Sequence, residues 1–220
     1  MTDMVTFPVD GRTATGYLAL PEQGKGPALL VLHAWWGLTD FFKAVCDRLA
    51  GEGFVALAPD LYHGKIATTV EEAERLAALD EDTASQDIMG AIAFLLKQPA
   101  TSGRTIGAVG FSLGGYWALL LKEPVTAIVT FYGLPAPESV TANAAFLGHF
   151  AEHDEFESLT SVRQLEAYLH SSGREASFYI YPGTQHWFFE QDRPDFYHPE
   201  AAQLAWERTI SFLRRSLERR

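Results

Sequence analysis

The sequence contains a single cysteine among its 220 residues. Cys46 therefore cannot form a disulfide within the chain, and its place in the expected helix Phe41–Ala50 is typical of a small buried apolar side chain. No apolar run approaches the ~20 residues of a membrane-spanning helix. The first ten residues alternate polar and apolar side chains and lack the basic and apolar regions of a secretion signal. We therefore expect a soluble, cytoplasmic protein without a membrane partner.

Basic residues are also scarce, with 17 Lys and Arg against 28 Asp and Glu and a formal net charge of -11. No cluster of Lys or Arg interrupts this acidic balance, which argues against a nucleic-acid partner. No G-x-G-x-x-G or P-loop pattern follows an expected strand, so neither a dinucleotide nor a phosphate-bound cofactor is predicted. We expect a small-molecule substrate, no cofactor, and a monomer or weak homodimer.

The pattern of apolar residues predicts a single α/β domain over residues 1–220. Hydrophobic residues make up 47% of the chain, enough for one large core. Alternating strands and helices favour a mainly parallel central sheet with helices on both faces. A hairpin turn is expected at Asp10-Gly11. Strands are expected over 5–9, 13–20, 28–32, 54–58, 106–111, 127–132, 145–150 and 177–181, and helices over 41–50, 70–79, 83–97, 116–121, 161–169 and 198–217.

The run Ile106–Gly115 indicates a nucleophile. Its apolar residues stop at Ser112, which Gly110 and Gly114 flank in a G-x-S-x-G pattern. In such an elbow the serine sits on a strained strand-to-helix turn, where a neighbouring side chain would collide with the backbone. The alternative is an ordinary glycine turn in which Ser112 only caps the helix that follows.

A serine hydroxyl needs a base within hydrogen-bond reach and a group that orients the base. His186 follows the last expected strand and Asp154 follows the one before it. The carboxyl ends of parallel strands share one edge of a sheet, so these residues can meet Ser112 there. The resulting chain order, Ser, Asp, His, is that of α/β-hydrolases. Glu152 and Glu155 compete with Asp154 for the acid role.

The loop after the third expected strand, His33–Gly37, is a second candidate for the site, because it also follows a strand end. An oxyanion hole needs two backbone N–H groups, which Leu113 and Trp35 can supply. Aromatic Trp36 and Trp187, together with His33, are candidates for the substrate pocket. Metal binding is not predicted, because His149 and His153 straddle an expected strand end instead of sharing one helical face.

Six segments together resemble the dienelactone hydrolase family of small, lidless α/β-hydrolases. They are Ala28–Gly37, Ala58–Tyr62, Gly110–Gly115, Phe131–Gly133, Asp154 and Gly183–His186. The resemblance implies an α/β-hydrolase fold without a large cap domain. It also implies a catalytic triad of Ser112, Asp154 and His186. The implied oxyanion donors are Trp35 and Leu113, and Tyr132 matches a tyrosine that lines the family's pocket.

Three positions differ from the founding enzymes of that family. Ser112 replaces their cysteine nucleophile, and Ala34 replaces a glutamate that takes part in activating the thiol. These two changes agree, because a serine activated by His186 needs no carboxylate to control a thiolate. Glu190 stands where those enzymes place an arginine for the substrate carboxylate, and a second such arginine belongs to a segment that is shortened here. This pattern favours substrates without a carboxylate.

The sequence therefore predicts a serine hydrolase that cleaves small carboxylic esters through an acyl-enzyme. One alternative is a dienelactone or other lactone hydrolase that uses the same triad. The other is a hydrolase fold that has lost catalysis and retains ligand binding.

Overall fold

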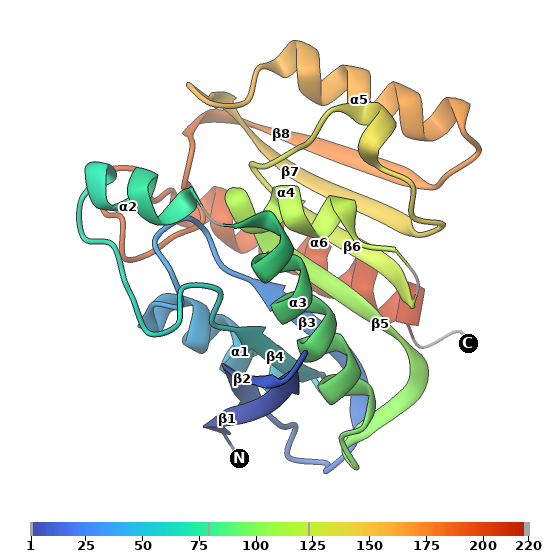
Figure 1. Ribbon diagram of the computed structural model, residues 1–220. Coiled ribbons are helices and arrows are strands. Elements are labelled where there is room, and N and C mark those ends of the chain that lie inside the picture. Colours follow the sequence, from blue (N-terminus) through green and yellow to red (C-terminus); the bar gives the residue numbers. More distant parts are fainter. Residues whose placement is uncertain (1, 79, 123, 218–220) are drawn as a thin grey trace. The chain divides into compact units, whose positions relative to one another are not determined.

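A computed structural model of the protein describes residues 2–78, 80–122 and 124–217 (Figure 1). These residues form eight strands and six α-helices, so the fold is α/β, as the sequence predicts. Contacts divide the chain into two compact units, Met1–Ile106 and Gly107–Arg220, called here the first and second unit. The single domain expected over residues 1–220 stays a prediction.

The first unit begins with an antiparallel hairpin of β1 (Thr2–Val9) and β2 (Arg12–Ala19). Asp10 and Gly11 form its turn with φ angles of 37° and 79°. A two-residue turn with both φ angles positive matches the twist of the strands that it joins. The hairpin predicted at Asp10-Gly11 is confirmed.

The rest of the first unit surrounds two buried strands. β3 (Gly26–Leu32) pairs in parallel with β4 (Val55–Pro59), and β2 pairs antiparallel with β4, so the strand order is β1-β2-β4-β3. The helices α1 and α3 contact β4 from opposite faces (Figure 1). The helices are α1 (Asp40–Gly51), α2 (Val70–Ala77) and α3 (Glu81–Leu96). Residue 79, the expected end of the second helix, lies outside the described residues.

The second unit contains the end of β5 (Thr101–Phe111) and three parallel strands in the order β6-β7-β8. The helices α4 and α6 contact β6 from its two faces (Figure 1). The elements are α4 (Leu113–Leu120), β6 (Val125–Phe131), the short 3₁₀ helix η1 (Pro137–Ser139), β7 (Ala145–His153), α5 (Leu159–Ser171), β8 (Ala176–Gln185) and α6 (Pro199–Leu217). The described residues contain no insertion that forms a large cap domain. None of the described helices is both long and apolar enough to cross a membrane.

Two strands of the second unit are longer than the sequence indicates. β7 continues to His153 past an irregularity between Ala151 and His153, and β8 continues to Gln185. Pro182 and Gly183 indicate a turn, but β8 is last in the strand order, and an edge strand tolerates a residue without an N–H. As a result Asp154 and His186 directly follow their strands.

A buried carboxylate ties three segments of the first unit together. Asp87 of α3 has a side chain that is 1% exposed and forms an ion pair with Arg12 at the start of β2. His63 Nε2, from the loop after β4, lies 3.4 Å from Asp87 Oδ2. Charges in such a place need partners, because desolvation of an unpaired ion is costly.

Removing this carboxylate should destabilise the protein strongly. We expect Asp87→Ala to lower the free energy of unfolding by about 2–3 kcal/mol, because it leaves the partly buried Arg12 guanidinium without its carboxylate partner. Asp82→Ala, which removes an exposed carboxylate from the same helix, should cost less than about 1 kcal/mol. Urea unfolding measures both, and equal losses would show that the ion pair contributes little.

Candidate active site

Ser112 lies on a sharp turn between β5 and α4 in the second unit. Its φ of 51° and ψ of -115° are rare for a residue with a side chain. A Cβ at Gly110 would lie 2.1 Å from the carbonyl oxygen of Gly114, so this turn requires glycine at position 110. Among the residues that the structure describes, the Ser112 hydroxyl caps no N–H of α4. This geometry is that of a nucleophile elbow and not of an ordinary helix cap.

Three side chains of the second unit form one hydrogen-bonded chain. The Ser112 hydroxyl lies 2.9 Å from His186 Nε2, and His186 Nδ1 lies 2.8 Å from Asp154 Oδ2. The side chains of His186 and Asp154 are 5% and 1% exposed. The arrangement fits the tautomer in which Nδ1–H donates to Asp154 and Nε2 accepts the hydroxyl proton.

Backbone donors hold the Asp154 carboxylate in place. Its Oδ1 accepts hydrogen bonds from the N–H groups of Phe156 (2.9 Å) and Glu157 (3.0 Å). The competing Glu152 instead accepts from the N–H of Gly183 (2.8 Å), and Glu155 is exposed. Within the described chain, Asp154 is the carboxylate that contacts His186.

The end of β6 and the residues that follow it contact the backbone of the Ser112 turn. The N–H of Ser112 donates to the carbonyl of Phe131 (2.9 Å), and a Cβ at Gly133 would lie 2.0 Å from the Ser112 carbonyl oxygen. Between these two residues, Tyr132 adopts a φ of 39° and donates its N–H to His149 (2.8 Å). Any side chain at position 133 would displace the backbone of Ser112.

Aromatic rings enclose the imidazole of His186. The rings of Tyr132 and Phe156 each lie 4.8 Å from it, and that of Trp187 lies 4.9 Å away. Phe156 is 53% exposed, although it contacts a nearly buried histidine. Sequence reasoning missed Phe156, because the acidic stretch around it is typical of a solvated surface; a lone aromatic within that stretch was the available signal.

Known proteins are similar to this chain in fold or in sequence along most of its length. The structure of a "putative dienelactone hydrolase" from Klebsiella pneumoniae is similar with a TM-score of 0.86 and 21% identity, covering 97% of this chain and 98% of that one. "Protein usf" of Aquifex pyrophilus is 35% identical over 99% of this chain and all of its own length. A "putative carboxymethylenebutenolidase" of Aquifex aeolicus is 33% identical over the same shares.

A model of the dienelactone hydrolase family matches residues 14–217. The chain belongs to that family. It is therefore a carboxylic-ester hydrolase of the dienelactone hydrolase type with an α/β-hydrolase fold, and the resemblance seen in the sequence motifs is confirmed.

The loop His33–Gly37, which contains the remaining site candidates, lies in the first unit of this dienelactone hydrolase. His33 is 1% exposed, its Nδ1 lies 2.7 Å from the Ala34 carbonyl, and its Nε2 accepts from the N–H of Leu61 (3.2 Å). Its imidazole therefore stabilises the loop. The rings of Trp35 and Trp36 lie 5.4 Å apart in an edge arrangement. The roles of these three residues in oxyanion and substrate binding stay predictions.

Other candidate residues belong to the second unit. Leu113 opens α4, and the first N–H groups of a helix have no partner within it, which suits an oxyanion donor. Tyr132 is fully buried and Trp187 is 6% exposed, so each contacts His186 more than solvent. Their contact with substrate stays a prediction.

His149 has a structural environment. Its ring nitrogens lie 2.8 Å from the Tyr181 hydroxyl and 3.0 Å from that of Thr209. Burial lowers its pKa to about 3, so the ring is neutral near pH 7. The described residues include no group of three His, Cys, Asp or Glu side chains placed to hold a metal ion.

The sequence suggests that Glu190, which stands at the position of a family arginine, disfavours substrates with a carboxylate. The structure does not support that expectation. It is fully buried, and burial raises its pKa to about 8, so the carboxyl is largely neutral near pH 7. Its Oε1 accepts a hydrogen bond from the Tyr132 hydroxyl (2.9 Å). Near pH 7 Glu190 therefore presents little negative charge to a substrate, and it gives no reason there against a substrate that carries a carboxylate.

A half-buried carboxyl, that of Glu157, lies beside Asp154. Glu157 accepts from the N–H of Leu134 (3.2 Å), and burial, with a smaller contribution from the Asp154 charge, raises its pKa to about 7. The folded protein thus binds this proton more tightly than the unfolded chain, in which the pKa is about 4.3. The stability that this proton contributes is present below about pH 4.3 and is lost as the pH rises toward 7.

Glu157→Gln should remove this pH dependence while keeping an acceptor for Leu134. We expect the variant to be more stable than the wild type at pH 8 by no more than about 3 kcal/mol, with a smaller difference at pH 5. Urea unfolding at the two pH values measures the change, and Glu155→Gln at an exposed neighbour is the control. A difference that does not depend on pH would contradict the titration of Glu157.

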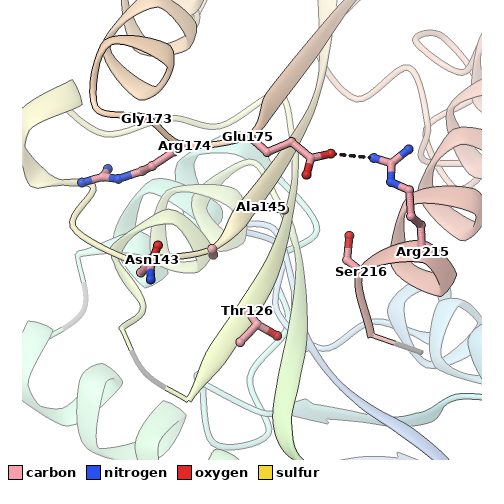
Figure 2. A pocket seen from close by; sticks show the side chains of 9 residues that line it. Thr126, Asn143, Ala145, Gly173, Arg174, Glu175, Arg215 and Ser216 are labelled. Carbon is pink, nitrogen blue, oxygen red and sulfur yellow. Dashed lines mark hydrogen bonds and ion pairs between the residues drawn. The ribbon is translucent and has the colours of Figure 1, made fainter. Parts of the chain in front are cut away.

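A separate hollow of about 600 Å³ lies at the amino-terminal ends of β7 and β8 (Figure 2). Its lining is mostly polar, and the Glu175–Arg215 ion pair (3.0 Å) lies within it. Ser112, Asp154 and His186 follow the carboxyl ends of β5, β7 and β8, so the hollow is at the other end of the strands. It is distinct from the candidate active site.

Proposed function

We propose that the protein is a serine hydrolase that cleaves small carboxylic esters through an acyl-enzyme. The observation that carries this proposal is the hydrogen-bonded chain Ser112–His186–Asp154, with Ser112 on a strained turn. A strained backbone persists only where surrounding structure maintains it, and such strain is common at functional residues. The Phe131 carbonyl and the close approach of Gly133 supply that support here.

The geometry supports a two-step reaction. His186 Nε2 takes the proton of Ser112 as Oγ attacks the ester carbonyl, and the imidazolium then protonates the departing alkoxide. Asp154 orients the ring and stabilises its positive charge. The N–H groups of Leu113 and Trp35 hold the oxyanion in this proposal. Water, activated by His186, then cleaves the acyl-enzyme and frees Ser112.

Aromatic rings around His186 favour apolar substrates. Because His186 must reach the leaving oxygen, the rings beside it lie on the side of the leaving group. Phe156, with half of its surface exposed, is available there for an aryl or alkenyl group. We therefore propose small esters with apolar acyl or aryl groups as substrates.

Lactone hydrolysis by the same triad is the second candidate. A relative from Aquifex aeolicus carries the name "putative carboxymethylenebutenolidase", and the buried, largely neutral Glu190 removes the electrostatic argument against an anionic lactone. Both reactions pass through an acyl-enzyme at Ser112 and differ in the substrate alone.

Parallel assays with p-nitrophenyl acetate, phenyl acetate and a dienelactone test the proposal. We expect measurable kcat/KM on both esters, with a larger value than on the dienelactone. A value at least tenfold larger on the dienelactone would assign the lactone reaction instead. No turnover of any of the three, together with retained ligand binding, would favour a hydrolase fold that has lost catalysis.

A further inference from the structure

A buried pair links Glu190 to the candidate active site. Glu190 Oε1 accepts from the Tyr132 hydroxyl (2.9 Å), and both residues are 0% exposed. Among the described residues, Glu190 Oε2 has no hydrogen-bond partner. Native structures seldom bury a carboxyl group without satisfying both of its oxygens, so Glu190 calls for an explanation beyond packing.

Tyr132 contacts the base, and its two neighbours in the chain contact the backbone of the nucleophile. Its flanking residues Phe131 and Gly133 contact the backbone of Ser112, and its ring packs 4.8 Å from the imidazole of His186. Its φ of 39° is unusual for a large aromatic residue. Two hydrogen bonds hold it there, from its N–H to the His149 carbonyl and from its hydroxyl to Glu190. A shift of Tyr132 would therefore reach both reacting side chains.

We propose that Glu190 is a positioning residue, which acts through Tyr132 to set the place of His186 and whose ionisation changes the rate of hydrolysis. The proposal rests on the function proposed above for Ser112. It assigns Glu190 a role in supporting the base, in place of a role in binding the substrate carboxylate.

The charges around Glu190 set when it ionises. Desolvation raises its pKa most, the hydrogen bond from Tyr132 lowers it, Asp192 raises it and Arg193 lowers it, with a result of about 8. Beyond Tyr132 lie the Asp154 carboxylate and His186. Glu190 is therefore largely neutral at pH 6.5 and largely ionised at pH 9.

Two interactions determine the direction in which ionisation of Glu190 changes kcat. A carboxylate accepts from the Tyr132 hydroxyl more strongly than a neutral carboxyl does, which fixes the ring more firmly. Its negative charge also favours the imidazolium that His186 becomes in the transition state, in a site where water screens little. Ionised Glu190 should therefore raise kcat.

Three variants test this role through the dependence of kcat on pH between 6.5 and 9. We expect the wild type to show a rise of about threefold with an apparent pKa near 8, in addition to the titration of the base. Glu190→Gln keeps an acceptor for Tyr132 and cannot ionise, so this rise should disappear. At pH 6.5 Glu190→Ala should lower kcat by about tenfold, and Glu190→Gln by less than about threefold. Tyr132→Phe, which lacks the hydroxyl, should keep only the part of the rise that comes from the charge of Glu190.

A second measurement does not need catalysis. The NMR signals of the His186 ring should shift with an apparent pKa near 8 in the wild type and not in Glu190→Gln. Glu175→Gln, which removes a carboxylate from the hollow at the other end of the strands, is the control. Coincident kcat profiles and ring titrations in the wild type and Glu190→Gln would overturn the proposal. Labelling of Ser112 by a fluorophosphonate tests the nucleophile by a separate measurement, so coincident profiles would leave the proposed hydrolase function standing.

Discussion

Ser112→Ala should lower kcat for ester hydrolysis by about 10⁴-fold or more. The variant removes the oxygen that lies 2.9 Å from His186 Nε2, so no acyl-enzyme can form. Any residual rate would come from water positioned beside His186 and from the remaining oxyanion donors. Steady-state kinetics with p-nitrophenyl acetate measure the loss, after subtraction of the uncatalysed rate.

Ser139→Ala is the matched control for that experiment. It makes the same chemical change at an exposed position in η1, and its kcat should stay within about twofold of the wild type. Thermal unfolding should show that both variants remain folded. A folded Ser112→Ala protein that keeps more than a tenth of the wild-type kcat would exclude Ser112 as the nucleophile.

Asp154→Asn should lower kcat by about 10³–10⁴-fold. Both carboxylate oxygens lie within 2.9 Å of His186 Nδ1, and an asparagine amide can instead donate to this nitrogen. The ring would then hold its proton on Nε2 and could not accept the proton of Ser112. A retained KM would show that the substrate still binds.

Glu152→Gln and Glu155→Gln are the controls for Asp154, because these two carboxylates compete for the same role in the sequence. Glu152 hydrogen-bonds to Gly183 and Glu155 is exposed, so each variant should lose less than about fivefold in kcat. A larger loss in either variant than in Asp154→Asn would reassign the acid.

Local signals in the sequence predict much of this fold correctly. The Asp10-Gly11 turn, the buried run of β3 and the glycines around Ser112 each leave few backbone conformations open. Strand ends are less predictable, because pairing with β7 overrides the turn preference of Pro182-Gly183 and extends β8 to Gln185. Composition alone could not show that.

In the candidate site, too, some residues can be predicted from the sequence and others depend on the fold. Residue type and chain order predict Ser112 as the nucleophile and His186 as the base, since few side chains can take either role. The choice of Asp154 over Glu152 depends on where the backbone N–H groups of residues 156 and 157 point, which only the fold reveals. The environment of Glu190 is likewise invisible in the sequence, because its meaning depends on burial against Tyr132.

The central claim is that Ser112 is an activated nucleophile, and mass spectrometry of the protein after treatment with a fluorophosphonate tests it most directly. We predict a single phosphonyl adduct on the peptide that contains Ser112, at a rate that falls sharply in Asp154→Asn, and no adduct in Ser112→Ala. A folded wild-type protein that stays unlabelled, or a Ser112→Ala variant labelled to the same extent, would contradict the account.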